Sequence, residues 1–86
     1  MAIYIDSPNK GWSHMVSDNI KELHIFATSI GIKKCWYQNK KGKHQPHYDV
    51  NKNKFQTAID NGAVLVSSKE IVEFLKSNYK NEKEIW

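Results

Sequence analysis

Apolar and polar positions follow two different periods along this chain, and the changes of period predict three strand and helix pairs. Short runs of apolar, β-favouring residues predict strands. These runs are residues 2–5, 32–37 and 63–66. Apolar residues that recur every three or four positions predict helices. The helical stretches are residues 19–30, 51–61 and 67–79.

Capping signals support the positions of two of these helices. Asn19 followed by Glu22, and Ser67 followed by Glu70, match the capping box. In that motif two side chains satisfy backbone N–H groups at the start of a helix. A glycine follows each of the first two helical stretches, where a left-handed residue commonly ends a helix. We therefore expect each helix to be bounded by its own local sequence.

The alternation of strands and helices favours a parallel sheet, because a right-handed helical crossover is the compact connection between parallel strands. Lys33 and Lys34 interrupt the second strand, which suits an edge position. We expect an α/β fold: a small three-layer β-α-β-α-β-α unit with a three-stranded parallel sheet, order 2-1-3, and helices on both faces. Residues 1–79 would form this single domain, and residues 80–86 a charged C-terminal tail.

Length and composition limit the class of protein. A chain of 86 residues has room for one modest core. Hydrophobic residues at 40% and charged residues at 26% indicate a folded rather than a disordered chain. Cys35 is the only cysteine, which excludes an intrachain disulfide and a multi-cysteine zinc site and fits a cytoplasmic setting. The chain has no apolar run of membrane-span length and no signal-peptide pattern, so we expect no membrane partner.

The positive charge of the chain is carried by lysine alone. The net charge is +4, with thirteen lysines and no arginine. Arginine is the usual side chain for reading guanine edges, so we expect no sequence-specific binding to duplex DNA. Weaker attraction to a small phosphorylated ligand or to a polyanion stays open. The loop around Lys40–Lys43 is predicted to be exposed to solvent.

Chemically active side chains gather at one end of the expected sheet. In an open parallel sheet, ligands bind beyond the carboxyl ends of the strands. Three helix N-termini would point to that end and favour a negatively charged ligand. Residues 46–49 place an imidazole, a phenol and a carboxylate side by side near it. The expected ligand-binding residues are Asp6, Trp12, His14, Asp18, Trp36, Gln38, His47, Tyr48, Asp49, Ser67 and Ser68.

Several of these residues also carry a resemblance to a known family. The motifs are Trp12-Ser13-His14-Met15, Trp36-Tyr37-Gln38 and His47-Tyr48-Asp49, together with the N-terminal run through Asp6. In this order and spacing, over about residues 1–75, the chain resembles a family of short phage and bacterial proteins called domain of unknown function 4031. The resemblance implies a phage-type or bacterial origin and groups these residues as one site, but it implies no substrate.

The leading functional hypothesis is a binding module. Its pocket would capture a small anionic, nucleotide-like ligand without a cofactor, for example as a phage-type protein that sequesters a host signalling nucleotide. Trp12, Trp36 or Tyr48 would stack on a base, while His14 and His47 are among the groups that would hydrogen-bond to it. A small core also favours a homo-oligomer.

Two alternatives belong to other classes. The first is a metal-dependent phosphoesterase or nuclease-like hydrolase, in which Asp6, Asp18 and Asp49 hold Mg²⁺ or Mn²⁺. In that class the candidate catalytic residues are His14, His47 and Asp49. The second alternative is an interaction module whose aromatic and basic surfaces bind a protein or a single-stranded nucleic acid.

Overall fold

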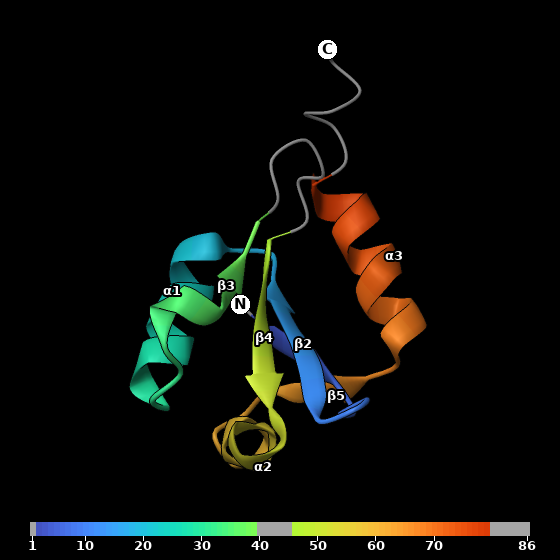
Figure 1. The fold of residues 1–86 in the computed structure, drawn as a ribbon. Coiled ribbons are helices and arrows are strands. Elements are labelled where there is room, and N and C mark those ends of the chain that lie inside the picture. Colours follow the sequence, from blue (N-terminus) through green and yellow to red (C-terminus); the bar gives the residue numbers. More distant parts are fainter. Residues whose placement is uncertain (1, 40–45, 80–86) are drawn as a thin grey trace.

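The computed structural model describes residues 2–39 and 46–79 (Figure 1). The expected polar loop at Lys40–Lys43 and the expected tail at 80–86 lie outside the described residues. The strands of the described part are β1 (Ile3–Asp6), β2 (Trp12–Ser17), β3 (Tyr37–Gln38), β4 (His47–Asn51) and β5 (Val64–Val66). Its helices are α1 (Ile20–Ser29), α2 (Lys52–Asp60) and α3 (Ser68–Tyr79), and a 3₁₀ turn, η1 (Lys34–Trp36), precedes β3.

The strands form one mixed sheet in the order β3-β4-β2-β1-β5. β1 and β5 are parallel neighbours, whereas β2 pairs antiparallel with both β1 and β4, and β3 pairs antiparallel with β4. The prediction of a three-stranded parallel sheet of order 2-1-3 in a three-layer unit is therefore wrong. The first and third predicted strands correspond to β1 and β5, which are parallel neighbours as expected. The second predicted strand corresponds in part to β3, and two unpredicted strands, β2 and β4, separate it from β1.

A tight turn explains why β2 runs antiparallel to β1. Asn9 and Trp12 exchange backbone hydrogen bonds of 2.8 and 3.2 Å across Lys10 and Gly11. Both central residues have positive φ, 56° at Lys10 and 88° at Gly11. Positive φ at both positions is the requirement of a type I′ turn, whose twist suits an antiparallel hairpin. The strand β2 was not predicted, because residues 12–17 lie between the expected strand at 2–5 and the expected helix at 19–30.

The second predicted strand is mostly not a strand. Ile32 is buried in the core, η1 follows it, and β3 then contributes two residues that pair with β4. This segment does lie at an edge of the sheet, as its lysines suggested. It does not lie beside β1, because the two neighbours of β1 in the sheet are β2 and β5.

The helices begin where their caps predicted. The Asn19 side chain accepts a hydrogen bond from the Glu22 backbone N–H at 3.0 Å. At α3, Ser67 Oγ accepts from the Glu70 backbone N–H at 3.1 Å, and Glu70 Oε1 accepts from the Ser67 backbone N–H at 2.8 Å. Hydrogen bonds to the Glu70 carboxylate, first from the Ser67 backbone N–H and then from the Ser67 side chain, lower the pKa of Glu70. Among the described helices, none has the length and apolar character needed to cross a bilayer.

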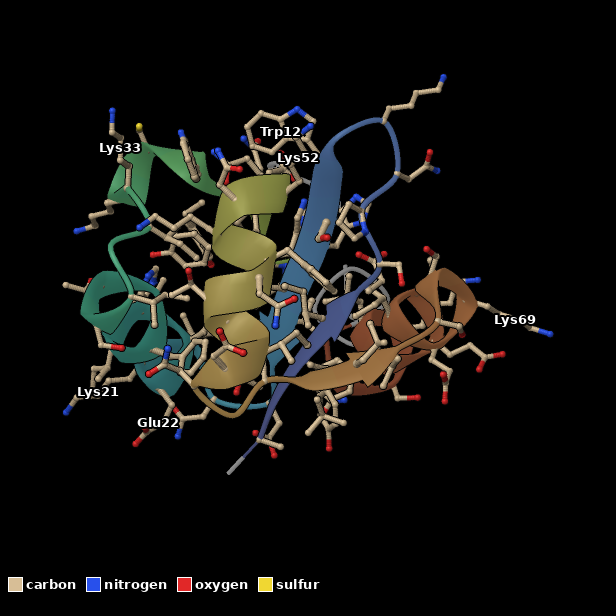
Figure 2. The ribbon with its side chains drawn as sticks, turned by 90° about the horizontal axis from the view of Figure 1, so that it is seen from below. Trp12, Lys21, Glu22, Lys33, Lys52 and Lys69 are labelled. Atoms are coloured by element: carbon tan, nitrogen blue, oxygen red, sulfur yellow. The ribbon has the colours of Figure 1, made fainter. Side chains whose placement is uncertain are left out.

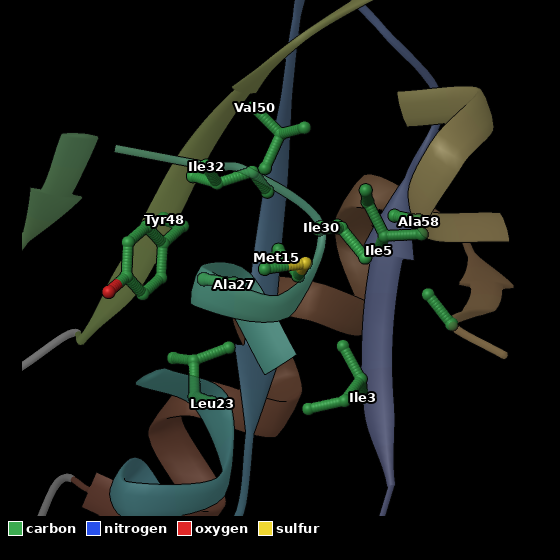
Figure 3. Close-up of a cluster of buried hydrophobic side chains, with 11 residues drawn as sticks. Ile3, Ile5, Met15, Leu23, Ala27, Ile30, Ile32, Tyr48, Val50 and Ala58 are labelled. Carbon is green, nitrogen blue, oxygen red and sulfur yellow. The ribbon is translucent and has the colours of Figure 1, made fainter. Parts of the chain in front are cut away.

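The two faces of the sheet bury separate cores. The larger core joins β1, β2 and β4 to α1 and α2 (Figure 3). Its buried members include Ile5, Met15, Leu23, Ala27, Tyr48, Val50 and Ala58. On the other face, Val16 packs with Ile71 and Leu75 of α3. Thus α1 and α2 cover one face, while α3 covers the other face over β1 and β2 and leaves side chains of β4 and of the start of β2 accessible.

Candidate functional site

Strand periodicity places the polar side chains of β2 and β4 on the accessible face. Successive side chains of a strand point to opposite faces, and residues opposite each other on paired strands share a face. Met15 lies opposite Tyr48, and both are buried in the larger core. The neighbouring pair, His14 opposite Asp49, therefore points to the other face, beside α3. We call the part of this face that α3 leaves accessible the open face.

Asp6 is the buried anchor of the open face. It is 1% exposed. One carboxylate oxygen accepts the His14 backbone N–H at 2.6 Å. The other lies 3.0 Å from His14 Nδ1 and accepts the Ser68 hydroxyl at 3.0 Å. Asp6 thereby joins the end of β1 to β2 and to the first turn of α3.

Two histidines and a carboxylate meet next to this anchor. His14, His47 and Asp49 each offer one ligand atom, and these atoms all lie within 4.8 Å of one another. The two imidazole centroids are 5.5 Å apart, and the rings meet edge to face. His47 Nε2 lies 3.2 Å from Asp49 Oδ1. We call these three residues the His-His-Asp cluster.

A hollow of about 470 Å³ opens on one side of the cluster. Trp12 and Trp36 form its aromatic part, with ring centroids 5.6 Å apart and planes at 81°. Trp12 is 44% exposed and lies at the rim of the molecule near the start of α2 (Figure 2). The lining residues are Asn9, Lys10, Trp12, His14, Cys35, Trp36, Gln38 and Asp49. We call this space the tryptophan hollow.

A smaller hollow of about 190 Å³ lies on the other side, between the sheet and α3. Asp6, His14, His47 and Ser68 supply its polar lining, and side chains of α3 such as Leu75 supply its apolar lining. His14 borders both hollows. The His-His-Asp cluster therefore stands at their junction.

Most of the expected site residues do come together, although by a different route. They meet through strand pairing on one face of the sheet and not through loops beyond parallel strands. The residues brought to the open face or its hollows are Asp6, Trp12, His14, Trp36, Gln38, His47, Asp49 and Ser68. The residues left outside are Asp18, Tyr48 and Ser67.

The structure shows where each of these three residues lies instead. Tyr48 lies in the larger core, where its hydroxyl is 2.7 Å from His24 Nδ1, so the expectation that it lines a ligand site is corrected. Burial, with a smaller contribution from the nearby Tyr37, raises the pKa of Tyr48. Asp18 follows the far end of β2, four residues and roughly 13 Å along an extended strand from His14. Ser67 caps α3.

Sequence reasoning missed three residues of the tryptophan hollow, namely Asn9, Lys10 and Cys35. The Lys10-Gly11 pair was the signal for the first two, because a hairpin turn there brings the preceding loop beside Trp12. Cys35 offered no comparable signal, since its segment was read as a strand. It is exposed and lies in η1, directly before Trp36.

The helix N-termini do not converge as the parallel fold required. α1 starts beyond Ser17, which pairs with Ile3 at the beginning of β1, whereas α3 starts beyond Val66, which pairs with Asp6 at its end. The two helices accordingly start at opposite ends of the sheet (Figure 1). The expectation that three helix dipoles attract one anion is therefore corrected.

Comparison with known protein families gives a match over most of the chain. The model of a family described as Protein of unknown function (DUF4031) matches residues 3–78, which include every residue of the open face named above. The resemblance expected from the motifs is thereby confirmed. No curated protein and no solved structure matches the chain.

Proposed function

The chain belongs to the DUF4031 family, whose description assigns no activity, and we propose from its own site that it binds a small nucleotide-like ligand in the tryptophan hollow. The observation that carries the proposal is the pair Trp12 and Trp36 beside polar groups on the open face. The volume of about 470 Å³ lies within the range of about 300 to 1,000 Å³ that small-molecule sites occupy.

The two indole rings suit a flat heterocycle. Their planes meet at 81°, so the rings form a corner rather than a filled stack. A base that stacks on one ring then meets the other nearly at a right angle, which limits how it can turn. Stacking of a base on an aromatic side chain contributes about 1 to 3 kcal/mol and tolerates different bases.

The polar lining suits the rest of such a ligand. The amides of Asn9 and Gln38 can donate to and accept from a base edge or a ribose hydroxyl. Lys10 is the cation among the residues that line the hollow, and it can pair with a phosphate. Asp49 in the same lining repels a free anion, so the phosphate is expected at the Lys10 side.

The lysines elsewhere support a local site rather than a broad basic surface. Lys21, Lys33 and Lys69 lie at separate corners of the described part of the molecule (Figure 2). A single-stranded nucleic acid needs a continuous basic groove along its backbone. Among the described residues, this spread of lysines supports the small-ligand proposal better than the interaction module.

The test is a calorimetric titration of the protein with mononucleotides, cyclic nucleotides and cyclic dinucleotides. We expect saturable binding of at least one compound. Trp12→Ala should weaken that binding about 5- to 150-fold, which corresponds to the loss of one stacked base. Ile25→Ala is the matched control, because Ile25 is 53% exposed but lies on α1, which covers the opposite face of the sheet.

Alkylation of Cys35, the only cysteine of the chain, gives an independent test of the same ligand site. Cys35 lines the tryptophan hollow and is exposed, so a bound ligand should slow its alkylation. If no compound in the panel binds, or if Trp12→Ala and Ile25→Ala behave alike, the tryptophan hollow is not the ligand site.

Hydrolysis of the bound phosphoester is the second candidate function. The observation that favours it is the contact between the His14 and His47 rings at the end of the hollow, because histidine is the side chain that most often transfers protons in catalysis. Recovery of the ligand after the titration separates the two functions. Intact ligand supports binding alone, whereas breakdown products that disappear in His47→Ala support a hydrolase.

A further inference from the structure

We propose that the His-His-Asp cluster binds one divalent transition-metal ion, with His14, His47 and Asp49 as its ligands and Asp6 as a positioning residue. This metal site does not depend on the nucleotide proposal, because its ligands are defined by their own geometry. The cluster has two nitrogen ligands and one oxygen ligand from two neighbouring strands. Three protein ligands with room left for a further ligand are typical of catalytic metal sites.

The spacing of the side chains fits a coordination shell. Metal bonds to imidazole nitrogen or carboxylate oxygen are about 2.0 to 2.2 Å long, so ligand atoms around one ion lie about 3.0 to 3.5 Å apart. His47 Nε2 and Asp49 Oδ1 are 3.2 Å apart. The third ligand atom lies within 4.8 Å of the others, and a rotation of the His14 ring, whose side chain is 49% exposed, can close that difference.

The contact with Asp6 leaves Nε2 of His14 as the nitrogen that can bind a metal ion. An ionised carboxylate can only accept, so the 3.0 Å contact between Asp6 and His14 Nδ1 places the proton on Nδ1. Nε2 then carries the lone pair that a metal ion requires. A carboxylate behind a ligating histidine is the usual way in which proteins fix the tautomer and raise the basicity of a metal ligand.

The donor set indicates the class of ion. Imidazole nitrogen suits Zn²⁺, Co²⁺, Ni²⁺ and Fe²⁺, whereas Mg²⁺ and Ca²⁺ prefer oxygen ligands. The three-carboxylate set expected for Mg²⁺ or Mn²⁺ is not assembled here, because Asp18 lies at the far end of β2 and Asp6 is engaged by His14 and Ser68. The cluster therefore points to a transition metal.

The position of the ion would connect the two hollows. His14 borders both, and Asp49 lines the tryptophan hollow. A dication held there would reverse the local charge near Asp49 and attract an anionic group of a ligand in the tryptophan hollow.

The test uses untagged protein stripped of metal with a chelator. Titration with Co²⁺, followed by visible absorption, and with Zn²⁺, followed by calorimetry, should give one ion per chain. His14→Ala and His47→Ala should each weaken binding at least 100-fold. His24→Gln is the matched histidine control, because His24 contacts Tyr48 in the larger core and should leave metal affinity within about twofold.

Asp6→Asn tests the positioning role separately. Its amide oxygen can still accept the His14 backbone N–H, but its amide nitrogen would donate to His14 Nδ1 and so move the ring proton to Nε2. We expect a 10- to 100-fold loss of metal affinity. The ring ¹⁵N shifts of His14 should show the changed tautomer, a signature that a general loss of stability would not produce.

Two results would overturn the metal site. One is the absence of saturable Zn²⁺ or Co²⁺ binding to the wild-type chain. The other is binding that persists unchanged in both His14→Ala and His47→Ala. Either result leaves the nucleotide titration interpretable, because Trp12→Ala reports on the hollow without removing a proposed metal ligand.

Discussion

Replacing Tyr48 with alanine is expected to lower the free energy of unfolding by about 3 to 5 kcal/mol, the usual cost of truncating a buried aromatic side chain. Tyr48 is 1% exposed and lies among the buried side chains of the larger core (Figure 3). Its hydroxyl also satisfies His24 Nδ1 at 2.7 Å. A chain of 86 residues has a total stability of roughly 4 to 13 kcal/mol, so the variant should lose a large part of it.

Chemical denaturation measures this effect, and Tyr48→Phe separates packing from hydrogen bonding. The phenylalanine variant keeps the ring and should lose only about 1 to 2 kcal/mol. Because burial raises the pKa of Tyr48 above its ordinary value of 10.0, the wild-type contribution is complete below pH 10 and declines as the pH rises through the folded-state pKa. Tyr48→Phe should therefore show a shallower loss above that pH. A Tyr48→Ala variant of near wild-type stability would contradict the buried position.

The second large effect is expected at Asp6. Asp6→Ala should cost about 1 to 3 kcal/mol, because it leaves a partly buried backbone N–H and two side-chain groups without their acceptor. The bonds lost are those from the His14 backbone at 2.6 Å, from His14 Nδ1 at 3.0 Å and from the Ser68 hydroxyl at 3.0 Å. The loss should loosen the junction of β1, β2 and α3.

Ser68→Ala is the matched control for Asp6. It removes one of the same three bonds and leaves the other two in place, so it should cost only about 0.5 to 1.5 kcal/mol. Denaturant titrations of the two variants compare them directly. Equal losses in Asp6→Ala and Ser68→Ala would show that Asp6 does not anchor the open face.

The helices could be predicted from the sequence because their signals are local. Asn19, Asn51 and Ser67 each accept a backbone N–H at the start of a helix, and the expected ranges agree with α1, α2 and α3 to within two residues. Capping depends on residues within one turn of each other. The helix positions could therefore be predicted correctly although the sheet was not.

The sheet could not be predicted in the same way because its pairing is set at long range. In β2, Ser13 and Ser17 are buried polar residues, so the alternation of burial along the strand is not an alternation of hydrophobicity. In β4, His47 and Asp49 obscure a strand of five residues that ends where α2 begins. Neither segment was predicted as a strand, and the expected fold class was wrong for that reason.

In the candidate site, too, local chemistry could be predicted from the sequence but the direction of each side chain could not. The side-chain chemistry of His14, His47 and Asp49 was visible in the sequence, and the structure brings these groups together. Tyr48 was included with them because it is their neighbour in sequence. Only the pleat of β4 shows that it points to the opposite face, into the core.

Both proposed sites depend on the antiparallel pairing of β2 with β4, which sets His14 opposite Asp49. Nuclear Overhauser contacts between backbone protons in isotopically labelled protein test this pairing most directly. We expect cross-strand contacts for the pairs His14 with Asp49 and Met15 with Tyr48. Absence of these contacts, with β3 instead pairing with β1, would contradict the open face and both of the sites proposed on it.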